Sequence, residues 1–112
     1  MKLLKGAQKI SAVIKTISPA TRLAILLAIG NGEACVCHLE AVLGKRQAYI
    51  SQHLMALRRA GILLDRRDGR FVYYRIADLA VLELIRDARR LAGVEIDMPS
   101  IKTICECPQC AE

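Results

Sequence analysis

The residues with the most distinctive chemistry are five cysteines, which lie in two groups. Cys35 and Cys37 are separated by one residue, and a second group near the C-terminus contains Cys105, Cys107 and Cys110. Thiolates are soft ligands, so cysteines at such short spacings select soft, thiophilic ions. The N-terminus shows no secretion signal, and an odd number of cysteines then favours free thiols or a metal site over a disulfide framework. We therefore expect a cytoplasmic protein whose cysteines bind an ion.

The charge balance makes nucleic acid the first partner to consider. Lys and Arg number 17 against 11 Asp and Glu, a formal net charge of +6, and a basic surface attracts polyanions. The 112 residues suffice for one domain, of which 54% are hydrophobic. That is more than one small core hides, which favours a homodimer. The longest apolar run, 23–29, is far short of the roughly 18 residues that span a membrane, so we expect no membrane association.

The spacing of apolar residues predicts a mainly helical chain with one β-hairpin. Ser18 is expected to cap the second helix, Asp78 to cap the last, and Asp68 and Gly69 to form the hairpin turn. The predicted helices cover residues 8–17, 19–29, 37–43, 47–60 and 79–92, and the predicted strands cover 62–67 and 70–76. Two of these helices, joined by a turn at Gly44, have the layout of a helix-turn-helix.

The chain resembles the ArsR/SmtB family of winged helix-turn-helix repressors over two runs, LGKRQAYISQHLMALRRAGIL and DRRDGRFVYYRI. The resemblance extends from Ser18 to Ala92, and the Ser-x-His-Leu-x-x-Leu-x-x-Ala-Gly core is its most specific part. It implies a dimeric, mainly α fold with about five helices and a two-stranded wing. Residues 1–93 would be the dimerisation and DNA-binding domain, and residues 94–112 a cysteine-containing tail. A homodimer of this family binds an imperfect palindrome in double-stranded operator DNA and releases it on sensing an effector.

The helix that begins at Gln47 is the one expected to read DNA. Its N-terminal, outward-facing turns carry Gln47, Ser51 and Gln52, and possible base contacts include Tyr49. Amide and hydroxyl side chains suit base edges, and Gln forms two hydrogen bonds with adenine. His53 is open to three interpretations, which are a base contact, a phosphate contact and a hydrogen-bonded structural role.

Phosphate contacts are expected from arginines on both sides of this helix. Arg66, Arg67 and Arg70 cluster about the hairpin tip, where the wing would neutralise phosphates. Arg46 stands where the family often has a capping Ser or Thr, and Ala48 stands where it often has Pro. Because an Arg side chain cannot cap in that way, we expect Arg46 to contact phosphate.

Within the family, a Cys-Val-Cys motif before the helix-turn-helix is the hallmark of sensors for As(III), Cd(II) or Pb(II). The resemblance therefore implies that Cys35 and Cys37 bind such an ion, with no organic cofactor. Some arsenic-responsive members supply a third Cys at the position of Glu40, and the usual Asp after the motif is replaced by His38. The third ligand then comes from elsewhere or is His38, which we otherwise interpret as a surface residue.

The C-terminal cysteines offer the missing ligands. Cys105 follows Gly93 by 105 − 93 = 12 residues, a stretch of up to about 40 Å when extended. We favour a set of three or four thiolates drawn from both groups, within one chain or across the dimer. The alternative is a separate site made by Cys105, Cys107 and Cys110.

Two other functions use the same cysteines. The first keeps the fold and makes the cysteines a thiol-redox or persulfide sensor that releases the operator on forming a disulfide. The second is a dithiol oxidoreductase, because Cys107 and Cys110 form a Cys-x-x-Cys. That motif normally opens a helix behind a strand, and here it trails the C-terminus, so we expect no enzyme. The family's zinc site on the last helix is not expected either, because no His follows Asp78.

Overall fold

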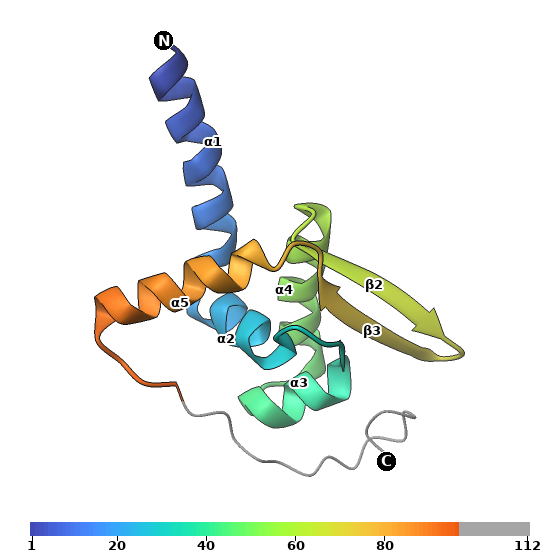
Figure 1. The fold of residues 1–112 in the computed structure, drawn as a ribbon. Coiled ribbons are helices and arrows are strands. Elements are labelled where there is room, and N and C mark those ends of the chain that lie inside the picture. Colours follow the sequence, from blue (N-terminus) through green and yellow to red (C-terminus); the bar gives the residue numbers. More distant parts are fainter. Residues whose placement is uncertain (97–112) are drawn as a thin grey trace.

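The computed structural model describes residues 1–96, which form helices and a small antiparallel sheet with strand order β1-β3-β2. The helices are α1 (Lys2–Ile17), α2 (Ala20–Ile29), α3 (Val36–Leu43), α4 (Gln47–Arg59) and α5 (Ala80–Ala92), and the strands are β1 (Ala34–Cys35), β2 (Leu63–Asp68) and β3 (Phe71–Ile76). Figure 1 shows the β2–β3 hairpin projecting from the helical body beside α4, while α1 projects from the body in another direction. The predicted helices and wing are confirmed, with a third strand added.

The core that supports the DNA-reading helix is aliphatic. Helix α4 contributes Ile50, Leu54 and Leu57, each 0% exposed, at a spacing that places them on one face of the helix. They pack against buried side chains from the other helices and the sheet, which include Ile25, Leu26, Leu39, Leu63 and Ile85. Because this face is fully buried, the opposite face of α4 is the one that solvent reaches.

Two predicted helix caps have different outcomes. Asp78 Oδ1 accepts a hydrogen bond from the Ala80 backbone N–H at 2.9 Å, so Asp78 caps α5 as predicted. The prediction for Ser18 is wrong, because Ser18 ends α1 in a helical conformation and its hydroxyl donates to the Lys15 carbonyl at 3.3 Å. Pro19 precedes α2 instead. An N-cap residue needs extended backbone, which Ser18 does not adopt.

The hairpin turn lies one residue later than predicted. Strand β2 extends to Asp68, which pairs with Phe71, so the two-residue loop consists of Gly69 and Arg70. Gly69 has a φ of +62°, and a positive φ at the first loop position is where a type II′ hairpin requires glycine. The shift places Arg70 at the tip of the wing.

The strand β1 was not predicted, and it adds a third strand beside the two-stranded wing. Ala34 pairs with Tyr74, and Cys35 pairs with Tyr73, on the central strand β3. A strand of two residues is too short to show an alternating pattern. Its consequence is that the first cysteine is paired with the central strand of the sheet.

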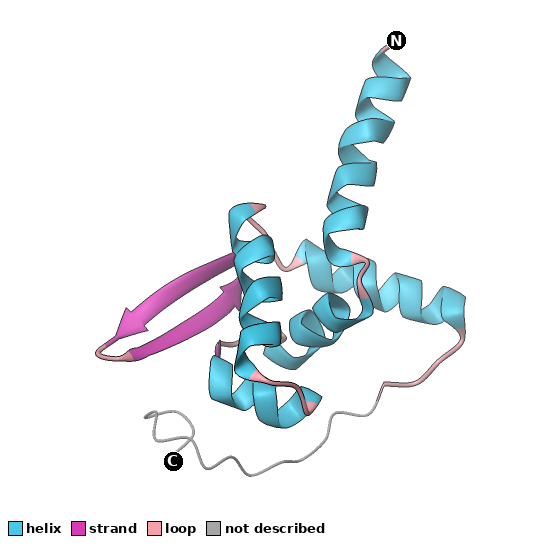
Figure 2. Cartoon of the chain, turned by 180° about the vertical axis from the view of Figure 1, so that it is seen from behind, coloured by secondary structure: helices cyan, strands magenta, loops and turns pink. Residues whose placement is uncertain are grey.

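The terminal helices α1 and α5 carry exposed apolar side chains. Helix α1 begins at Lys2 rather than at residue 8 and stands away from the body in both views (Figures 1 and 2). Leu3 is 80% exposed and Leu91 of α5 is 91% exposed. Within residues 1–96, α1 and α2 have the length and composition of a membrane span only as a pair bent by 80°, and no single helix has them.

Candidate DNA interface and thiol site

The predicted base-reading residues lie in the first turns of α4. The helix begins at Gln47, and Arg46 before it is in an extended conformation without a side-chain cap hydrogen bond among the described residues. Gln47 and Gln52 are exposed, Ser51 is half-buried, and Arg46 is exposed. Gln47 and Gln52 are therefore open to solvent, and Ser51 is partly so.

Two other residues that were predicted to contact DNA, Tyr49 and His53, make side-chain contacts with helix α2. The Tyr49 hydroxyl lies 3.0 Å from Thr21 Oγ1, and the His53 ring packs edge-to-face on Tyr49 with centroids 4.8 Å apart. Arg22 Nε–H donates a hydrogen bond to His53 Nδ1 at 3.0 Å. A nitrogen that accepts carries no proton, so His53 is the neutral tautomer with its proton on Nε2. Burial, and then the positive charge of Arg22, lower the pKa of His53.

The wing arginines fall into two kinds. Arg66 Nε and Nη2 donate to the two carboxylate oxygens of Glu33 at 3.0 and 2.9 Å, and its guanidinium lies 4.6 Å from the Tyr73 ring centroid. Arg67 and Arg70 are exposed, and the Arg70 guanidinium lies 5.1 Å from the Phe71 ring. Arg66 is thus tied to the loop that precedes β1.

The Cys35–Cys37 pair lies where β1 meets α3. Cys35 is 3% exposed and is the residue before α3, and half-buried Cys37 lies in the first turn. Their sulfur atoms are 2.9 Å apart. They line a cavity of about 270 Å³, whose other lining residues come from α3, from the start of α4 and from the wing: Val36, Glu40, Gln47, Arg70, Phe71 and Val72. The cavity therefore brings the two sulfurs to the same place as a predicted base reader and a predicted phosphate contact.

The residues present supply two sulfur ligands for a thiophilic ion but not a complete site. Within residues 1–96, no cluster of three or more His, Cys, Asp or Glu side chains could hold a metal ion, so His38 does not complete the pair. The predicted tail ligands Cys105, Cys107 and Cys110 lie outside the described residues. Two close sulfurs suit a soft ion, and the donor set is open to further thiolates.

The 2.9 Å between the sulfur of Cys37 and that of Cys35 exceeds the disulfide bond length of about 2.05 Å, so these two cysteines are not bonded to each other.

Sequence reasoning did not identify three residues at these sites, which are Thr21, Arg22 and Glu33. Arg22 is a charged residue inside an otherwise apolar helix, which was a usable signal because a half-buried guanidinium needs an acceptor. Glu33 precedes the cysteine motif and opposes an arginine-rich hairpin, but its partner is 33 residues away in the chain. No spacing rule pairs residues at that distance.

The order of these elements defines the class of the protein. Helices α3 and α4, joined by a short turn and followed by the β2–β3 hairpin, form a winged helix-turn-helix, a DNA-binding fold. The family model described as "Bacterial regulatory protein, arsR family" matches residues 19–63. The chain belongs to this family, whose members are DNA-binding transcriptional regulators and not enzymes.

Both sequence relatives and a solved structure support the assignment to this family. Arsenic resistance transcriptional regulator ArsR2 of Pseudomonas putida is 51% identical over 65 residues, 57% of this chain and 56% of that protein. The uncharacterized HTH-type transcriptional regulator MJ1325 of Methanocaldococcus jannaschii is 40% identical over 80 residues, 70% of this chain and 90% of that protein. The solved structure of the AntR antimony-specific transcriptional repressor has a TM-score of 0.71 at 31% identity, covering 78% of this chain and 79% of that chain. The match to ArsR2 thus spans little more than half of that relative's length.

Proposed function

We propose that this chain is a repressor whose homodimer binds double-stranded operator DNA in the cytoplasm and releases it when a thiophilic ion binds its cysteines. As(III), Cd(II) and Pb(II) are the candidate ions, and the ligands are three or four thiolates drawn from Cys35 and Cys37 and from Cys105, Cys107 and Cys110 of the tail. The observation that carries the proposal is the pair of sulfur atoms 2.9 Å apart in a cavity that Gln47 and Arg70 also line. The names of ArsR2 and AntR, which refer to arsenic and antimony, agree with this choice of ions.

The position of the two cysteines explains how an ion would act on DNA binding. Cys35 pairs with Tyr73 on the central strand of the wing, and Cys37 lies in the helix directly before α4. An ion that draws the two sulfurs into its own geometry shifts β1 and α3 together, and with them the wing and the start of the recognition helix. By linkage, an ion that weakens operator binding must itself bind the DNA-free form more tightly by the same factor.

The sulfur separation bears on which ions fit. With metal–sulfur bonds of about 2.3 Å, two sulfurs on one ion lie about 3.8 Å apart at a tetrahedral angle and about 3.3 Å apart at a right angle. The observed 2.9 Å is closer to the right-angle value. As(III), which forms similarly short bonds to sulfur at narrow angles, therefore needs less movement of the pair than a tetrahedral ion does.

In this proposal, α4 contacts the bases of the DNA and the wing contacts its phosphates. Gln47, Ser51 and Gln52 contact base edges, because they lie on the accessible side of the first turns of α4. Exposed Arg67 and Arg70 contact phosphates beside the groove. The formal net charge of +6 per chain supports association with a polyanion.

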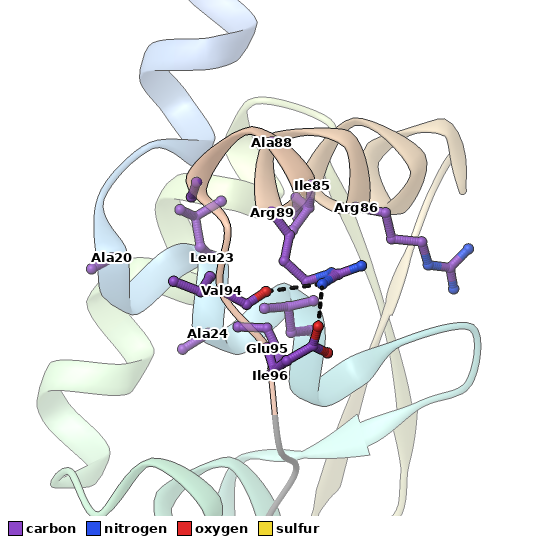
Figure 3. Close-up of a pocket in the computed structure, with 12 residues that line it drawn as sticks. Ala20, Leu23, Ala24, Ile85, Arg86, Ala88, Arg89, Val94, Glu95 and Ile96 are labelled. Atoms are coloured by element: carbon purple, nitrogen blue, oxygen red, sulfur yellow. Dashed lines mark hydrogen bonds and ion pairs between the residues drawn. The ribbon is translucent and has the colours of Figure 1, made fainter.

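A second copy of the chain would cover the apolar surface of the terminal helices. A groove of about 600 Å³ runs between α2, α5 and the segment after α5, with alanine, leucine and isoleucine side chains along most of its length. In Figure 3, Arg89 reaches across to Val94 and Glu95, and its Nη1 donates to the Val94 carbonyl at 2.9 Å. This contact keeps one wall of the groove in place, and exposed apolar residues of α1 and α5 continue the surface.

The proposal is tested by fluorescence anisotropy on a duplex that the wild-type protein selects from a random library. Arsenite, Cd(II), Pb(II) or Zn(II) is added to pre-reduced protein, and an oxidant is added in a separate arm. We expect thiophilic ions to weaken binding about 5- to 150-fold, the usual range of such coupling, and Cys35→Ser to abolish the response. His38→Asn is the matched control and should respond as wild type does. The proposal fails if no ion changes the affinity of the reduced protein.

A second candidate function is a thiol-redox or persulfide-responsive repressor with the same fold. The 2.9 Å between the sulfurs of Cys35 and Cys37 supports it, because an oxidant that joined two thiols this close in a disulfide would act on the same helix as an ion would. In the experiment above, this function predicts release by the oxidant and by no ion. Recovery of operator binding on reduction would support it further.

A further inference from the structure

Arg22 of α2 joins three helices through one guanidinium. Its Nη1–H donates to the Thr16 carbonyl at 2.9 Å, and its Nε–H donates to His53 Nδ1 at 3.0 Å. Thr16 lies in the last turn of α1, where carbonyls lack a partner within their own helix. The guanidinium therefore connects the end of α1 to the middle of α4.

A second contact lies one helical turn earlier on the same side of α4. The Tyr49 hydroxyl is 3.0 Å from Thr21 Oγ1, and the Tyr49 ring packs against His53. Tyr49 is in the first turn of α4, beside Gln47, and His53 follows at the i+4 position. These contacts determine where the first turns of α4 lie relative to α1 and α2, and those turns carry the proposed base readers.

The Arg22–His53 contact depends on the protonation state of His53. Protonated imidazole has donors on both nitrogens, so it cannot accept from Arg22 and places a second cation against the guanidinium. Helices α1, α2 and α3 and strand β2 pack on α4. Within the described residues, Arg22 on α2 is the charged group that acts on His53, besides burial. Tyr49 faces it from α4, and Lys45 lies 5.9 Å from the Tyr49 ring. The described residues that act on His53 thus include no carboxylate to offset the added charge.

We propose that Arg22 and His53 are positioning residues for DNA recognition, which hold α4 against α1 and α2, and that protonation of His53 releases this hold and reduces discrimination between operator and random DNA. The inference rests on the proposed operator binding by α4 and is independent of the ion. It assigns His53 the structural role among the three that its sequence position left open. It also adds Arg22, whose contacts are with His53 and Thr16.

The direction of the pH dependence follows from the lowered pKa of His53. The contact stabilises the folded protein above the ordinary histidine pKa of 6.5, and this stabilisation is lost as the pH falls through that value and the lower folded one. Protonation also adds positive charge near the DNA, which strengthens binding to any duplex. The ratio of random-DNA to operator dissociation constants therefore falls on acidification, even where total affinity does not.

The test measures that ratio by anisotropy between about pH 7.5 and about pH 4.5, which extends below the ordinary histidine range because the pKa of His53 is lowered. The operator probe is a duplex that wild type selects from a random library at the upper pH. For wild type we expect the ratio to fall about tenfold, the effect of losing one hydrogen bond to a charged group. His53→Asn places an amide oxygen where Nδ1 was, so it should keep the high ratio at both pH values. His53→Gln places its amide at the Nε2 position and should show the low ratio at both.

Controls separate positioning from folding and from other titrations. The chain has two histidines, so His38→Asn is the matched control and should behave as wild type. Thermal unfolding at the upper pH identifies any variant that is not folded, and a purely structural role would lower Tm without rescue of the ratio by His53→Asn. The nitrogen chemical shifts of the imidazole in the free protein should show the Nε2–H tautomer, and an Nδ1–H tautomer would overturn the inference.

The outcomes also distinguish this inference from the function on which it rests. If wild type selects no duplex, the proposed operator binding fails and the inference fails with it. If wild type selects a duplex but the ratio is the same at both pH values, only the inference fails. An equal fall in His53→Asn and wild type would likewise overturn it.

Discussion

Two side chains that were predicted to contact DNA, His53 and Arg66, are each hydrogen-bonded to another residue of the protein. These two contacts differ in burial. Arg22 and His53 meet between half-buried surfaces of α2 and α4. Arg66 and Glu33 meet at the edge of the wing, with side chains 48% and 24% exposed. An exposed ion pair contributes about 0–1 kcal/mol and is weakened by salt. A shielded hydrogen bond leaves unpaired groups when it breaks, at a cost of about 1–3 kcal/mol.

This difference in burial indicates which side of the DNA-binding surface is easier for an effector to displace. Helix α4 is anchored by its aliphatic core face and by Arg22, so the side next to α1 and α2 is the fixed one. The wing is held to the cysteine segment by β1 and by an exposed ion pair. The cysteines therefore lie on the side of the DNA-binding surface that is easier to displace.

The largest effect we predict on this comparison comes from Arg22→Ala. The change leaves His53 Nδ1 and the Thr16 carbonyl without their donor, so the free energy of unfolding should fall by about 1–3 kcal/mol. Urea unfolding at neutral pH measures it. Arg75→Ala, at an exposed arginine of β3 without a side-chain hydrogen bond among the described residues, is the control and should change stability by less. A loss no larger than that of the control would contradict the assignment of α4 to the fixed side.

An intermediate effect is predicted for Arg70→Ala at the wing tip. Losing one phosphate contact per protomer should flatten the slope of log K against log salt by about 0.9 per contact and weaken operator and random DNA alike. Anisotropy at several salt concentrations measures both. Gln47→Ala provides the contrast, since it should weaken operator binding and leave the salt slope unchanged. Equal losses on operator and random DNA for Gln47→Ala would remove its base-reading role.

The smallest effect is predicted for Glu33→Gln. Removing the charge from an exposed pair with Arg66 should lower the free energy of unfolding by less than about 1 kcal/mol, and the difference should shrink in high salt. Urea unfolding at low and high salt measures it. A loss as large as that of Arg22→Ala would erase the difference between the two contacts.

The sequence predicted the helices well because apolar spacing and glycine stops are local signals. The cap at Ser18 and the turn at Gly69 were harder to predict, because each depends on a backbone conformation that the neighbouring residues help to determine. The strand β1 is two residues long and exists only because β3 pairs with it. Local patterns cannot supply such a partner.

The residues of the candidate site also differ in how far local sequence could predict them. The cysteine motif and the polar start of α4 were recognisable by residue type and spacing. The orientation of His53 toward Arg22, 31 residues away, and of Arg66 toward Glu33 depends on how helices and hairpin pack. A residue type that suits DNA also suits an internal hydrogen bond, so composition alone could not assign either side chain.

The central claim is that ion binding at the cysteines and operator binding oppose each other. The most direct measurement is the affinity of pre-reduced protein for arsenite, once free and once saturated with operator duplex. Linkage predicts tighter arsenite binding to the free protein, by the same factor by which arsenite weakens operator binding. Equal arsenite affinity in the free and DNA-bound protein, or an unchanged result in Cys35→Ser, would contradict the account.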